Sequence, residues 1–178
     1  AWLNYLQGRW SDSLRDYNQA LFVNANSIEA RLGLTLPLLA MQRWGDAATE
    51  ARKVLAVSPW DYTAHLRLLL AEEGEKRWDE MARHAASLAT RFPSDATTLV
   101  YLARAEASRG NAKAAKAAYL QVLERAPGNT EAAAYLKTAT ALLVDDLTEM
   151  VGNWTADGAA RRALRDAGDT KALIMMFA

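Results

Sequence analysis

Apolar residues recur along most of this chain at the three- and four-residue spacing of amphipathic helices, as at Leu14, Tyr17 and Leu21. The same arrangement of apolar and polar positions returns every 34 residues without a gap. Six columns lie in register at this offset: Trp10, Trp44, Trp78 and Ala112; Leu34, Leu68, Leu102 and Leu136; Ser13, Ala47, Met81 and Ala115; Tyr17, Ala51, Ala85 and Tyr119; Leu21, Leu55, Ala89 and Leu123; Ala25, Pro59, Pro93 and Pro127. Chance could supply one such column, whereas six in register indicate an internal repeat.

Each period also carries its own stop and start signals. A proline ends three of the helical runs, and an Asp or Asn two residues later can cap the next helix. These residues are Pro59, Pro93 and Pro127, followed by Asp61, Asp95 and Asn129. Gly8 and Gly110 stand where a first helix would end, which is a usual place for glycine. The pattern therefore predicts helix, tight turn, helix and short loop in each period. The recurring tryptophan would open the second helix and pack across the turn as a core wedge.

This pattern resembles the tetratricopeptide repeat (TPR) family. The residues that carry the resemblance are Leu34, Trp44, Ala47, Ala51 and Pro59; Leu68, Trp78, Met81, Ala85 and Pro93; and Leu102, Ala112, Ala115, Tyr119 and Pro127. Leu69 departs from the family pattern, because a small residue is usual there. The resemblance implies an all-α fold, a right-handed superhelical solenoid of antiparallel helix pairs. We expect a partial first repeat over 1–27, repeats over 28–61, 62–95 and 96–129, a capping helix over 130–151 and a C-terminal helical segment over 152–178.

The C-terminal segment ends in a run of large apolar residues, Leu173 to Phe177. A free, solvated tail would not carry such a run, so we expect it to dock. It could pack beside the capping helix, or it could enter a groove of its own or of a neighbouring molecule, which would give a homo-oligomer. The chain begins at Ala1 inside what reads as the end of a helix, and we interpret it as a fragment of a longer protein.

Charge and composition exclude several classes of function. Lys+Arg and Asp+Glu both number 21, so the electrostatic signal of a nucleic-acid-binding protein is missing. With no cysteine, thiol catalysis and thiolate zinc sites are excluded, and the redox compartment stays open. The longest apolar runs are far below the ~18 residues of a membrane span, so we expect no direct membrane insertion. We expect a soluble protein of either the periplasm or the cytoplasm.

No constellation of residues suggests catalysis, a metal or a cofactor. His65 and His84 are the only two histidines, and without further ligands nearby they are expected on the surface or in packing. The adjacent carboxylates Glu72 and Glu73 diverge on a helix, which makes a poor catalytic dyad, so we expect a solvated face there. The chain is therefore not expected to be an enzyme.

In the TPR family the first helices line a concave groove where partners bind. The inward positions that match in this sequence are Leu32, Leu36, Leu66, Arg67, Leu70, Glu73, Val100, Tyr101, Arg104 and Tyr135. This wall suits an extended or helical peptide with apolar anchors and a carboxylate. The residues of the family's chaperone-tail clamp are missing, because Leu32, Leu36 and Tyr101 stand where charged or amide side chains are needed.

The leading hypothesis is a non-catalytic scaffold that binds a protein or peptide partner. By resemblance, bacterial relatives often serve secretion, pilus or envelope-polysaccharide assembly. Two alternatives stay open: a regulatory or substrate-recruiting part of an enzyme whose catalytic domain lies outside this chain, and a self-assembly module.

Overall fold

The computed structural model describes residues 1–141, which are helical apart from short turns and contain no strand. The helices are α1 (Trp2–Leu6), α2 (Trp10–Val23), α3 (Ile28–Ala40), α4 (Trp44–Val57), α5 (Tyr62–Gly74), α6 (Trp78–Arg91), α7 (Ala96–Ser108) and α8 (Ala112–Arg125). A further helix begins at residue 130 and continues to the end of the described range. Residues Ala1–Ala132 form one compact unit, and the chain from Ala133 belongs to a second. The end of the expected capping helix, the segment 152–178 and the run Leu173–Phe177 lie outside the described residues.

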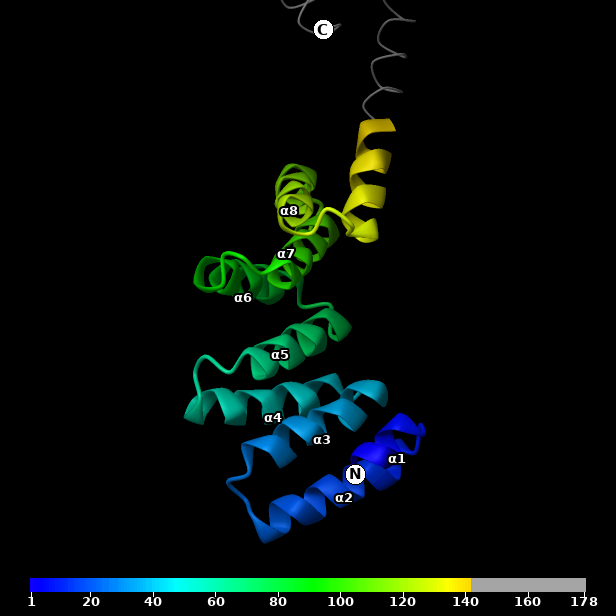
Figure 1. Ribbon diagram of the computed structural model, residues 1–178, viewed down its shortest axis with the longest axis vertical. Coiled ribbons are helices and arrows are strands. Elements are labelled where there is room, and N and C mark those ends of the chain that lie inside the picture. Colours follow the sequence, from blue (N-terminus) through cyan, green and yellow to red (C-terminus); the bar gives the residue numbers. More distant parts are fainter. Residues whose placement is uncertain (142–178) are drawn as a thin grey trace, which may run out of the picture. The chain divides into compact units, whose positions relative to one another are not determined.

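The helices come in pairs that repeat with the period of the sequence. Second helices begin at Trp10, Trp44, Trp78 and Ala112, as the pattern predicts. Within Ala1–Ala132, helices α1 to α8 follow one another in chain order, each packed against the next (Figure 1). The first unit, Ala1–Ala132, is thus an all-helical stack of hairpins.

Capping side chains fix where the first helices begin. Ser27 accepts a hydrogen bond from the backbone N–H of Ala30 at 3.1 Å, and Asp61 accepts one from Ala64 at 2.8 Å. Asp95 accepts from Thr97 and Thr98, and Asn129 accepts from Ala132. Each cap satisfies a backbone donor that the first helical turn leaves without a partner. The predicted caps Asp61, Asp95 and Asn129 are therefore confirmed.

The tight turns within the hairpins require a left-handed backbone residue. Gly8 and Gly110 supply it with φ of 72° and 78°, where glycine pays no steric penalty. In the middle two repeats the same place is taken by Gln42 and Lys76, both at φ 57°. These two side chains cost some stability, because the left-handed region is unfavourable for residues with a Cβ.

The tryptophans pack less deeply than the sequence suggests. Trp10 is 41% exposed, and Trp44 and Trp78 are half-buried. A Cβ added at Gly74 would meet the Trp44 ring at 2.3 Å, so this ring lies against the end of α5 in the following repeat. Trp44 also packs against the core cluster that holds Leu34 and Leu38 of its own first helix, so besides the expected packing within its hairpin it joins one repeat to the next.

The third repeat is packed differently from its neighbours. In repeats two and four the small pairs Thr35 with Ala47 and Ala103 with Ala115 are fully buried, and their helices pack closely. The corresponding positions of repeat three hold Leu69 and Met81, both fully buried in one cluster. Helices α5 and α6 contact each other much less than α3 and α4 or α7 and α8 do, and Figure 1 shows them apart. Two large side chains in place of two small ones account for this separation.

Candidate partner-binding face

The first helices of successive repeats lie beside one another, since α3 contacts α1 and α5, and α5 contacts α7. We call the predicted inward positions on α3, α5 and α7 the first-helix face: Leu32, Leu36, Leu66, Arg67, Leu70, Glu73, Val100, Tyr101 and Arg104. All of them except Val100 and Tyr101 are half-buried. Tyr135 lies in the helix after Asn129, in the second unit, and is half-buried.

Two members of this face are largely covered by their own chain. Val100 exposes 9% of its surface and Tyr101 exposes 8%. Tyr101 belongs to the core cluster of Leu69 and Met81, and Leu66 and Leu70 pack against the same cluster. Burial raises the pKa of the Tyr101 hydroxyl, as expected for a phenol removed from water. Val100 and Tyr101 thus support this face more than they offer surface to a partner.

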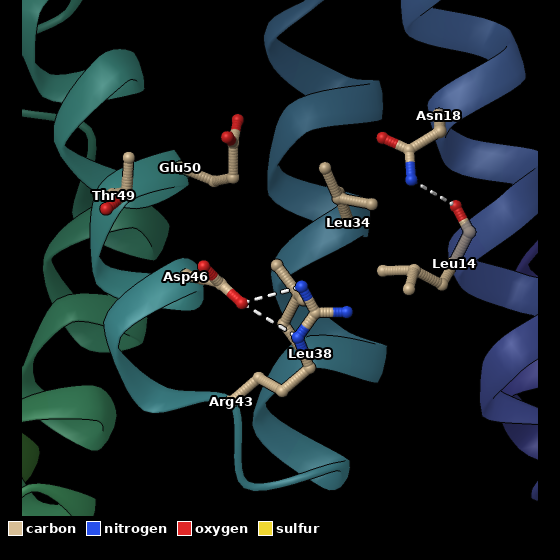
Figure 2. Close-up of a pocket in the computed structure, with 8 residues that line it drawn as sticks. All are labelled: Leu14, Asn18, Leu34, Leu38, Arg43, Asp46, Thr49 and Glu50. Atoms are coloured by element: carbon tan, nitrogen blue, oxygen red, sulfur yellow. Dashed lines mark hydrogen bonds and ion pairs between the residues drawn. The ribbon is translucent and has the colours of Figure 1, made fainter.

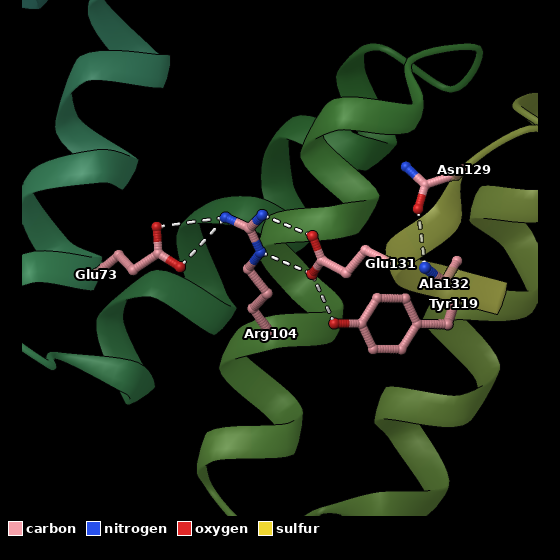
Figure 3. A network of polar contacts seen from close by, with 6 residues as sticks. All are labelled: Glu73, Arg104, Tyr119, Asn129, Glu131 and Ala132. Atoms are coloured by element: carbon pink, nitrogen blue, oxygen red, sulfur yellow. Dashed lines mark hydrogen bonds and ion pairs between the residues drawn. The ribbon is translucent and has the colours of Figure 1, made fainter. Parts of the chain in front are cut away.

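Arg104 is bound on two sides by carboxylates of its own chain (Figure 3). Its Nε and Nη2 donate to the two oxygens of Glu131 at 2.8 and 2.6 Å, and Nη1 donates to Glu73 at 3.3 Å. The hydroxyl of Tyr119 donates to Glu131 at 2.9 Å. Hydrogen bonds from Arg104 lower the pKa of the Glu131 carboxyl below its ordinary value, and Glu131 in turn raises the pKa of Arg104. Arg104 therefore links α5, α7 and the start of the next helix.

Arg67 differs from Arg104 although both project from first helices. Among residues 1–141 it forms no hydrogen bond or ion pair, and its Nε is buried without an acceptor. The positive charge of Arg67 favours the ionised form of the nearby Tyr101 hydroxyl and so opposes the effect of burial on its pKa. The Arg104 guanidinium lies 5.5 Å from the centre of the Tyr101 ring. The first-helix face thus holds one neutralised arginine and one arginine that has no anionic partner in the described part of the chain.

Glu72 does not lie on a solvated face, and that expectation is wrong. It is 5% exposed, and its Oε2 lies 3.0 Å from Nδ1 of His84. Nε2 of His84 is in turn 2.9 Å from Nδ1 of His65. The sequence placed both histidines in surface or packing roles, and the structure joins them across α5 and α6. In the described range no group of three or more His, Asp or Glu residues could hold a metal ion.

A separate hollow of about 190 Å³ opens between α2, α3 and α4 (Figure 2). It is lined by Leu14, Asn18, Leu34, Leu38, Arg43, Asp46, Thr49 and Glu50. The charged groups at its rim already have partners: Arg43 pairs with Asp46 at 2.7 Å, and Glu50 pairs with Arg31 at 2.7 Å. This hollow therefore presents no free charge to a ligand. No helix within residues 1–141 combines the length and hydrophobicity needed to cross a membrane.

Comparison with known proteins identifies the fold. No family model and no curated protein matches the chain. MamA from Desulfovibrio magneticus RS-1 (residues 41 to the end) superposes with a TM-score of 0.72 at 17% identity, covering 90% of each chain. A MamA RS-1 ArsTM double mutant gives the same TM-score and identity over 94% of this chain and 91% of its own.

A tetratricopeptide repeat protein from Parabacteroides merdae ATCC 43184 gives a TM-score of 0.61 at 24% identity. The match covers 69% of this chain and 48% of that one. These identities are low, so the likeness concerns the fold. Together with the period and the paired helices, it shows that this chain has the fold of a TPR-type helical repeat protein.

Proposed function

We propose that this chain is a non-catalytic scaffold whose first-helix face binds an extended apolar peptide carrying a carboxylate. The observation that carries this proposal is the contrast between the two arginines. Arg104 is satisfied by Glu131 and Glu73, whereas Arg67 has no anion within residues 1–141 and buries its Nε without an acceptor. A carboxylate on a partner would give the half-buried guanidinium of Arg67 the anionic hydrogen-bond acceptor that it lacks within residues 1–141.

The apolar part of the same face supports a peptide ligand. Leu32, Leu36, Leu66 and Leu70 are half-buried side chains on the adjacent helices α3 and α5. Half-buried leucines on neighbouring helices offer shallow apolar sites for alternate side chains of an extended or helical peptide. The parent protein would serve a bacterial assembly, secretion or envelope process, an inference supported by the bacterial sources of the similar structures.

A selection from a random-peptide library with free carboxyl ends tests this proposal. We expect enriched peptides to combine apolar residues with an Asp, a Glu or a terminal carboxylate. Arg67→Gln should weaken their binding at least tenfold, the effect of losing one charge-assisted hydrogen-bonded pair. The matched control is Arg52→Gln, because Arg52 is an exposed arginine on the second helix α4. Selected peptides without a carboxylate, or equal binding to the Arg67 and Arg52 variants, would refute the proposal.

Intramolecular occupation of the face is a separate outcome of the same experiment. If residues 142–178 supply the anion, the full chain would bind no selected peptide, whereas a chain ending at residue 141 would bind it. That result would identify the tail as the ligand and would contradict a scaffold with an open face.

A further inference from the structure

Both histidines of the chain lie in one hydrogen-bonded row across repeat three. Nε2 of His65, on α5, is 2.9 Å from the carbonyl oxygen of Pro59. Nδ1 of His65 is 2.9 Å from Nε2 of His84, on α6, and Nδ1 of His84 is 3.0 Å from the Glu72 carboxylate. The row therefore has three contacts in series, Pro59 to His65 to His84 to Glu72.

Counting hydrogens shows that the row is complete in only one protonation state of the histidine pair. A carbonyl oxygen and a carboxylate only accept, so His65 must donate from Nε2 and His84 must donate from Nδ1. The contact between the rings needs a third hydrogen, but two neutral imidazoles carry only two. One extra proton on the pair completes the row, and a second extra proton would set two N–H groups face to face between the rings.

The internal repeat provides a control inside the same molecule. Thirty-four residues before His65 and His84 stand Arg31 and Glu50, which form a direct ion pair at 2.7 Å. Thirty-four residues after them stand Leu99 and Ala118, both buried and apolar. The same two positions of the hairpin thus hold an ion pair in repeat two, a histidine pair in repeat three and two buried apolar residues in repeat four. Only the histidine pair changes its charge between pH 5 and 8.

The place of the row in the fold gives its protonation a mechanical consequence. Helices α5 and α6 have little direct contact, so the histidine row and the pair Leu69 and Met81 supply much of the interaction between them. Loss of the contact between the rings would leave α5 attached mainly to α4, and α6 attached mainly to α7. The two helices of repeat three are therefore joined less extensively than those of repeats two and four, and loss of the ring contact would loosen them further.

We propose that His65, His84 and Glu72 form a one-proton latch that fastens α5 to α6 within a window of pH and releases them on either side of it. This inference concerns the packing of repeat three and does not depend on the occupant of the first-helix face.

The charged groups around the row agree with this window. His65 is surrounded by His84, Glu72 and Asp61, and Arg77 acts on Glu72 from the start of α6. On the helices packed against α5, Glu50 of α4 binds Arg31, and Arg104 of α7 binds Glu73. Burial is the main cause that lowers the pKa of His65 below its ordinary value of 6.5. In the acid range the unfolded chain therefore binds the second extra proton, on His65, before the folded chain does, so stability falls as the pH falls below about 6.5. Above the window, the hydrogen between the rings is lost instead.

Imidazole nitrogen NMR tests the latch directly, because the chain has only two histidines to assign. Inside the window we expect His65 to keep its proton on Nε2 and the pair to hold one extra proton in total. The second proton should bind only well below pH 6.5. His84→Gln should remove this coupling and leave a single titration. Two independent histidines, each titrating near pH 6.5, would overturn the proposal.

Thermal unfolding against pH tests the mechanical consequence. The matched variant carries His65→Arg, Glu72→Leu and His84→Glu, which places the repeat-two residues Arg31, Leu38 and Glu50 in the frame of repeat three. We expect the melting temperature of the natural chain to fall by roughly 3–10 °C on each side of its maximum, the effect of losing one or two charge-assisted hydrogen bonds. The grafted variant should lack both falls. If the graft does not fold, His84→Gln serves in its place. Parallel profiles for the natural chain and the variant would refute the latch.

Discussion

Leu69→Ala should reveal how repeat three is held together. Leu69 is 0% exposed on α5 and shares a cluster with Met81, Leu88 and Tyr101. Truncation of a buried leucine costs about 2–5 kcal/mol, depending on how far the surroundings collapse. The separation of α5 and α6 allows some collapse once one large side chain is removed, so we expect a loss of about 3 kcal/mol. This is a large share of the ~5–15 kcal/mol that stabilises a typical domain.

Urea unfolding followed by circular dichroism measures this loss. The matched control is Leu120→Ala on α8, because Leu120 is 48% exposed and should cost less than about 1 kcal/mol. The slope of the unfolding free energy against urea should stay the same in both variants, so that the difference reports stability alone. An equal cost at the two positions would refute the assignment of Leu69 to the core between α5 and α6.

Three further predictions concern Arg104, Glu131 and the turns. Arg104→Ala should lower the free energy of unfolding by about 1–2 kcal/mol, a range that already allows for the partial exposure of this side chain. Arg67→Ala should change the free energy of unfolding by less than about 0.5 kcal/mol. Equal losses for the two variants in urea unfolding would contradict this prediction. Folding lowers the pKa of Glu131 from 4.5, so the stability that its carboxylate contributes is present above pH 4.5 and is lost as the pH falls through the lower pKa of the folded chain. Acid unfolding should show this loss of stability in the natural chain and a smaller loss in Arg104→Gln. Lys76→Gly should raise the free energy of unfolding by about 0.5–1 kcal/mol, because φ at this residue is 57°. Gly110→Ala should lower the free energy of unfolding by about 1 kcal/mol, because φ at this residue is 78°. A higher melting temperature for Gly110→Ala would contradict the left-handed conformation of this turn.

The sequence by itself determined the local features of the fold. Helix starts at Ile28, Tyr62 and Ala96 follow from Ser27, Asp61 and Asp95, because a cap acts on backbone groups two or three residues away. The period of the helix pairs follows from apolar spacing and proline positions, which also act over a few residues. At the 34-residue offset, His65 and His84 align with the oppositely charged residues Arg31 and Glu50. This alignment is a sequence signal that could have indicated a contact between the two histidines.

Tertiary structure alone decided which polar side chains are free. Arg67 and Arg104 carry the same side chain and both lie on first helices, yet only Arg104 meets Glu131 and Glu73, which are 27 and 31 residues distant in sequence. Glu72 and Glu73 are neighbours in sequence, yet one is buried against His84 while the other binds Arg104. The spacing of residues gives the direction of a side chain on its own helix. It does not give the distance between two helices, which in repeat three depends on the volumes of Leu69 and Met81 packed between them.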